Sequence, residues 1–149
     1  MDAHPGLLFK VRRDYSSYFD KPEQRESLLM RLVEIAPDPL YQGVLDRWRS
    51  SFVGRPAVSR DMVVASRLVT GLGDKGAFEW GLRLHHTYGM PIIPGTALKG
   101  VTSSLLDGRD GDDADQVRKA LFGDTTVAGT LVFHDAWWVP TRAVPKPFV

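Results

Sequence analysis

With 149 residues, of which 43% are hydrophobic and 25% charged, the chain has the length and composition of one globular domain, which excludes a disordered or collagen-like protein. The absence of cysteine excludes disulfides, thiolate metal sites and thiol nucleophiles, and the net charge of +1 neither requires nor excludes a nucleic-acid partner. No apolar run approaches the roughly 18 residues of a transmembrane helix, and the N-terminus lacks the apolar region of a signal peptide, so we expect a soluble, cytoplasmic protein with no membrane partner.

The first predicted elements are two helices, over about 22–36 and 39–49. Both carry apolar residues at helical spacing, and a short Pro-Asp-Pro link separates them. Because each stripe needs a partner surface, we expect the two helices to pack as an antiparallel hairpin with Leu32 and Leu45 buried. Together they would form an N-terminal helical region, residues 1–58, packed on the core.

Residues 59–149 are expected to form the main domain. The segment "MVVASRLVTGLG" from Met62 reads as a strand that ends in a glycine-rich turn, "FEWGLRLHHTYG" as a second strand, and "TLVFHDAWWV" as a last one. Between them, a helix is predicted from an N-cap at Thr96 through Leu106, and another from about 114 to 122 with Gly123 as its stop. This order predicts an α+β domain whose antiparallel sheet is covered on one face by helices.

The stretch "PIIPGTALKG" places a lysine close to a predicted helix start, where cations are unfavourable. It is not a Walker A motif, because the spacing before Lys99 is wrong. Two interpretations remain open. A helix N-terminus attracts phosphate, Lys99 would add a point charge, and Gly100 would let a backbone approach closely. Alternatively, the stretch is a Pro-Gly loop with a solvent-exposed lysine.

A second basic region lies earlier in the chain. Arg67 precedes the glycine-rich turn, which contains Gly71, Gly73 and Lys75. Basic residues beside such a turn can follow a phosphate backbone. Scattered surface arginine is an equally good explanation.

The histidines and their neighbours in sequence do not form a catalytic arrangement. His85 and His86 are adjacent and would point to opposite faces of a strand, as would His134 and Asp135. Neither pair provides a base held by an orienting carboxylate. We therefore expect no catalytic residue, no metal site and no cofactor.

Three segments together resemble a known family: "RLVTGLG", "GLRLHHTYGMPIIPGTALKGV" and "LFGDTTVAGTLVFHDAWW". In this order they are similar to the RAMP superfamily of CRISPR effector subunits, and within it most to the family of sixth Cmr-type subunits of type III-B complexes. The resemblance covers roughly residues 62–138. Where members often carry an arginine shortly after the Lys-Gly pair, this chain has Thr102, Ser103 and Ser104.

The resemblance implies a ferredoxin-like, RRM-type domain that is non-catalytic and binds guide RNA in a Cmr-type ribonucleoprotein for antiviral defence. It implies guide RNA, target RNA and other Cmr-type RAMP subunits as partners. The family's lysine corresponds to Lys99 and its small hydroxyl residue to Thr96. Since the relatives continue through further strands, we expect either a chain truncated at its C-terminus or a sheet completed by a partner. The candidate nucleic-acid-binding residues are Arg67, Gly71, Gly73, Lys75, Gly95, Thr96, Lys99, Gly100 and Ser103.

Two alternatives stay open. One is an RNA-processing endonuclease of the same superfamily that uses His85 or His86 as a general base. The other is an interaction domain that binds no RNA, in which "PGTALKG" is only a turn. Cleavage of RNA without metal would favour the first. RNA affinity that falls with salt would separate both RNA-binding hypotheses from the second alternative.

Overall fold

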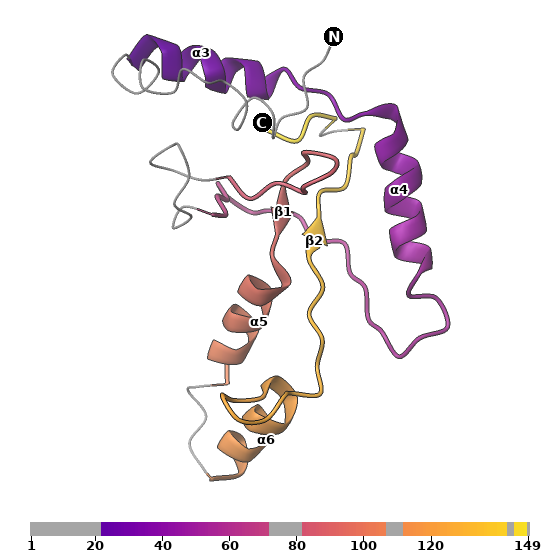
Figure 1. The fold of residues 1–149 in the computed structure, drawn as a ribbon, viewed down its shortest axis with the longest axis vertical. Helices are drawn as coiled ribbons and strands as arrows, with labels where there is room; N and C mark the ends of the chain where they lie inside the picture. The colour runs from indigo at the N-terminus through magenta and orange to yellow at the C-terminus, as the bar shows by residue number, and fades with distance from the viewer. Residues whose placement is uncertain (1–21, 72–81, 107–111, 143–144, 149) are drawn as a thin grey trace. The chain divides into compact units, whose positions relative to one another are not determined.

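The computed structural model describes residues 22–71, 82–106, 112–142 and 145–148 (Figure 1). The chain divides into two compact units, which are treated separately below. The larger unit comprises Met1–Ile92 with Trp137–Val149, and the smaller unit comprises Ile93–Ala136. The predicted domain boundary at residue 58 stays a prediction. In the part of the chain that the structure describes, no helix has both the length and the apolar character needed to cross a bilayer.

The two N-terminal helices form where the sequence predicts them, as α3 (Pro22–Val33) and α4 (Pro39–Ser50). The side chain of Asp38 caps α4 by accepting a hydrogen bond from the backbone N–H of Leu40 at 2.7 Å. Leu32 and Leu45 are both buried, as expected.

The antiparallel pairing predicted for these helices is wrong. Figure 1 shows α3 and α4 joined end to end around a bend and not side by side. Asp38 precedes a proline and has an extended backbone, with φ −57° and ψ 139°. Such a link does not reverse the chain tightly, because the residue before proline is held in the extended region.

An aromatic cluster forms the core of the larger unit. Tyr41 and Met90 are each only 1% exposed, and the ring centroids of Tyr88 and Trp138 both lie 6.0 Å from that of Tyr41. The Tyr41 hydroxyl donates a hydrogen bond to the backbone carbonyl of Trp138 at 2.7 Å. Burial raises the pKa of Tyr41 to about 12. A polar group inside the cluster is therefore satisfied by the backbone.

A tight hairpin presents the two adjacent histidines. The backbone N–H of His85 donates to the carbonyl of Met90 at 2.7 Å, and Gly89 in the turn has φ +66°. His85 is half-buried, with its ring centroid 4.6 Å from that of Trp137, whereas His86 is exposed. No strand forms over residues 82–89, so the two histidines differ in exposure but do not lie on opposite faces of a strand as expected.

The sheet is much smaller than the sequence predicts. It consists of β1 (Ile92–Ile93) paired with β2 (Ala136–Trp137) in antiparallel fashion. No strand forms over 62–71, where Met62 and Val63 are 88% and 95% exposed, so the strand prediction is wrong there. The same holds for 130–135, because the N–H groups of residues 130 and 131 donate to the last carbonyls of a helix instead of to a strand.

The smaller unit contains α5 (Gly95–Ser104) and α6 (Asp112–Phe122). Gly123 has φ +77° and ends α6, as predicted. Phe122 is buried and its ring stacks on Phe133 with centroids 5.8 Å apart. Helices with a small antiparallel sheet confirm the α+β class, while the ferredoxin-like arrangement stays a prediction.

Candidate nucleic-acid interface

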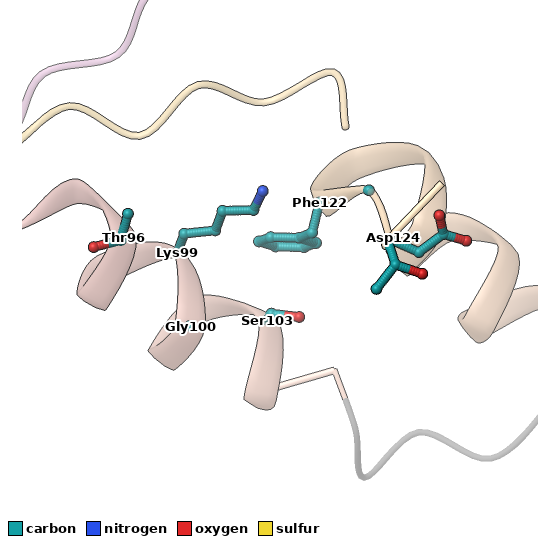
Figure 2. A pocket seen from close by; sticks show the side chains of 8 residues that line it. Thr96, Lys99, Gly100, Ser103, Phe122 and Asp124 are labelled. Atoms are coloured by element: carbon teal, nitrogen blue, oxygen red, sulfur yellow. The ribbon is translucent and has the colours of Figure 1, made fainter. Parts of the chain in front are cut away.

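An open pocket of about 420 Å³ lies between α5 and the end of α6 (Figure 2). Four of its lining residues come from α5 and are spaced 3, 1 and 3 residues apart, so they share one face of that helix. The remaining four come from the last residue of α6 and the loop that follows it. The residues that line this α5–α6 pocket are Thr96, Lys99, Gly100, Ser103, Phe122, Gly123, Asp124 and Thr125.

The α5 side of the pocket consists of residues that the sequence nominated. Thr96, Lys99, Gly100 and Ser103 all line it. Figure 2 shows the Lys99 side chain extending toward Phe122. A Cβ atom added to Gly100 would meet nothing within 4 Å, so the helix backbone is open to solvent there. Within the described parts of the chain, the side chains of Thr96, Lys99 and Ser103 have no hydrogen-bond or ion-pair partner. This wall therefore offers an ammonium group and two hydroxyls to a ligand.

The N-terminus of α5 is held differently from the prediction. Thr96 is not the N-cap: that position is Pro94, which has no side-chain acceptor. Instead, Oδ1 of Asp135 accepts a hydrogen bond from the backbone N–H of Gly95 at 2.7 Å. The anion that the helix dipole favours is thus a carboxylate of the same unit. Lys99 is the fifth residue of α5, beyond the first turn where the dipole acts most strongly, so its position breaks no local rule.

Gly95 has a packing role rather than a place in the pocket lining. It is buried, and a Cβ atom there would collide with the carbonyl group of Phe133 and the backbone of His134. The start of α5 passes directly against residues 133–134, which only glycine permits. Among the nominated glycines of α5, Gly100 faces open space and Gly95 faces backbone.

The α6 side of the pocket was not identified from the sequence. Its residues belong to the "LFGDTT" stretch, where the only signal was the Phe-Gly pair of the family resemblance. Gly123 is required here, because its φ is positive and a Cβ atom would collide with the backbone of Val127 and Gly129. Figure 2 shows the carboxylate of Asp124 turned away from Lys99.

Asp124 organises the loop that it begins. Its Oδ1 accepts hydrogen bonds from the hydroxyl and the backbone N–H of Thr126, both at 2.7 Å, and from the backbone N–H of Val127 at 2.8 Å. These bonds, from Thr126 foremost, lower the pKa of Asp124 to about 2. The Asp124 N–H donates back to the Val127 carbonyl at 2.9 Å, which closes the turn.

The other nominated residues do not join the pocket lining. Arg67 is exposed and Gly71 has φ +96°, and both belong to the larger unit. Gly73 and Lys75 lie outside the described residues. Across the described ranges, no group of three or more histidine or carboxylate side chains could hold a metal ion.

Comparison with known proteins assigns the chain to a family. A 49-residue segment is 49% identical to the CRISPR system Cmr subunit Cmr6 of Pyrococcus furiosus, and it covers 33% of this chain but only 14% of that protein. No solved structure shows a significant match. The model of the RAMP superfamily matches residues 61–147, which is more than half of the chain and includes the whole α5–α6 pocket. The chain therefore belongs to the RAMP superfamily.

Proposed function

We propose that this chain is a non-catalytic, guide-RNA-binding subunit of a type III-B, Cmr-type CRISPR ribonucleoprotein. Its partners would be guide RNA, target RNA and other Cmr-type RAMP subunits in the cytoplasm, and its core a ferredoxin-like RAMP domain. Membership in the superfamily and the similarity to Cmr6 support this proposal. The single observation that carries RNA binding is the α5 face, where Lys99 and two hydroxyl side chains lack described partners beside an open glycine.

These groups match the chemistry of an RNA backbone. A phosphate oxygen is an acceptor with negative charge, and an ammonium or hydroxyl group can donate to it. A hydrogen bond to a charged group contributes roughly 1.5–3 kcal/mol. Gly100 adds space, since no side chain separates the helix backbone from an approaching sugar-phosphate chain. Such contacts read the backbone, so they would bind RNA with little dependence on its sequence.

The absence of catalysis is also part of the proposal. The backbone N–H groups of Thr87 and Tyr88 donate to Nδ1 of His85 at 3.2 and 3.4 Å, which holds that ring within its own turn. Asp135 is committed to the N-terminus of α5. Both arrangements support a structural role for these residues. Cleavage of RNA at one site by the purified chain, lost in His86→Ala, would overturn this part of the proposal.

The central test is Lys99→Ala, measured as affinity for single-stranded RNA oligonucleotides of several sequences over a range of salt concentrations. We expect affinity to fall by roughly 10- to 150-fold for every sequence and the salt slope to fall by about one phosphate equivalent. Lys119→Ala is the matched control, because it makes the same change of charge on α6 at a lysine that pairs with Asp115 at 2.8 Å. The proposal fails if Lys99→Ala leaves affinity and slope unchanged, or if Lys119→Ala lowers them equally.

A further inference from the structure

We infer that the loop after α6 is the second wall of the phosphate site, with Thr125 as an RNA-binding residue and Asp124 as the residue that positions it. This inference rests on the proposed function and extends it to residues outside α5. The observation behind it is the α5–α6 pocket, in which Thr125 and Lys99 line the same volume from two different elements.

Thr125 has the donors that a phosphate group needs. It is exposed, and neither its hydroxyl nor its backbone N–H donates a hydrogen bond to any described residue. Its neighbours differ: the N–H groups of Asp124, Thr126 and Val127 are all used inside the loop. Within this turn, the unused donors therefore belong to Thr125, which lines the pocket.

The loop is held by hydrogen bonds within itself, which makes Thr125 a preorganised donor. The three hydrogen bonds to Oδ1 of Asp124 tie residues 126 and 127 back to the start of the loop. An isolated antiparallel bridge joins Gly123 to Ala128 and closes its base. Binding thus need not order a flexible segment, a cost that would otherwise subtract from affinity.

Asp124 carries a negative charge next to a proposed anion site, and its hydrogen bonds explain why this is tolerated. Its carboxylate is turned away from Lys99 in Figure 2. Three donors converge on one of its oxygens, and Lys119 also acts on it electrostatically. The charge is directed into the loop rather than into the pocket, so Asp124 acts through Thr125 and not on the RNA itself.

Two substitutions of Asp124 distinguish its geometric role from its charge. Asn can offer the same side-chain oxygen to the donors of residues 126 and 127, whereas Ala cannot. We expect Asp124→Ala to lower RNA affinity roughly tenfold. Asp124→Asn should leave the affinity within about twofold of that of the unmodified protein, or raise it, because this substitution removes a negative charge near the phosphate. Equal losses in both variants would overturn the positioning role.

Thr125→Val tests the contact itself, because valine keeps the shape and removes the hydroxyl. We expect affinity to fall roughly tenfold with the salt slope unchanged, since the hydroxyl carries no charge. Thr102→Val is the matched control: its hydroxyl donates to the Leu98 carbonyl within α5 and does not line the pocket. Unfolding midpoints are measured for each variant, so that lost binding is not confused with lost folding.

The outcomes distinguish this inference from the function on which it rests. If Lys99→Ala weakens binding while Thr125→Val and Asp124→Ala do not, the second wall is wrong and the RNA-binding function stands. If Lys99→Ala has no effect either, the function fails at this site. The double variant of Lys99 and Thr125 should show a non-additive loss, because both groups would contact one phosphate. Strict additivity would overturn a shared contact.

Discussion

The larger and the smaller unit hold their chains together in different ways. In the larger unit, side chains do the packing: the buried ring of Tyr41 meets Tyr88, Trp137 and Trp138 at centroid distances of 6.0–6.4 Å. In the smaller unit, backbone approaches backbone, because Gly95, Gly123 and Gly129 each lie where an added Cβ would collide with main-chain atoms. A side-chain core is damaged by removing atoms, whereas a glycine crossing is damaged by adding one.

The largest effect is expected from Tyr41→Ala, which should lower the free energy of unfolding by about 3–5 kcal/mol, as for other buried aromatic side chains. The substitution removes a ring that is 1% exposed and leaves the Trp138 carbonyl without its donor. Tyr41→Phe keeps the ring and should cost only about 0.5–1.5 kcal/mol. Chemical denaturation of the full chain would compare them. Equal losses in the two variants would show that the hydroxyl, and not the ring, holds this cluster.

Gly95→Ala should destabilise the protein by about 1–3 kcal/mol, because its added methyl group meets the backbone of Phe133 and His134, which cannot move aside as a flexible side chain would. The control is Gly43→Ala in α4, where a Cβ atom meets nothing within 4 Å. That change should be neutral or stabilise by about 0.5–1 kcal/mol, as alanine favours a helix. If Gly95→Ala is as stable as Gly43→Ala, the close crossing at the start of α5 is not real.

The smallest effects are on the pH dependence of stability, and they should fall at opposite ends of the scale. The raised pKa of Tyr41 means that its contribution is present below pH 10 and lost as the pH rises through about 12. The lowered pKa of Asp124 means that its contribution is present above pH 3.8 and lost as the pH falls through about 2. Tyr41→Phe should flatten the alkaline limb alone, and Asp124→Asn the acid limb alone. Unfolding curves across pH would contradict this if either variant altered both limbs.

The helices could be predicted because residues close in sequence determine where each helix begins and ends. Proline and aspartate start α4, and Gly123 ends α6, through backbone preferences that need no distant partner. The strands could not be predicted in this way. A β-branched run such as 62–70 forms a strand only where another strand supplies hydrogen bonds, and the sequence pattern does not say whether one is present.

The candidate site likewise has one part that local sequence predicts and one part that it does not. Spacing within one helix was enough to gather Thr96, Lys99, Gly100 and Ser103 on one face. The loop wall with Thr125 depends on how α6 packs against α5, which no local pattern encodes. The cap from Asp135 was missed for the same reason, since it lies 40 residues from Gly95 in sequence.

The cap that Asp135 provides at the N-terminus of α5 has a consequence for how this part of the chain folds. A ten-residue helix is marginal in water by itself, and the N-cap of α5, Pro94, makes no side-chain hydrogen bond to its first turn. During synthesis, residues 95–104 emerge well before Asp135 does, so the helix that carries Lys99 should stay frayed until the later segment arrives. A peptide that ends near Leu106 should therefore give little helical circular dichroism, while one that extends through Asp135 should recover it.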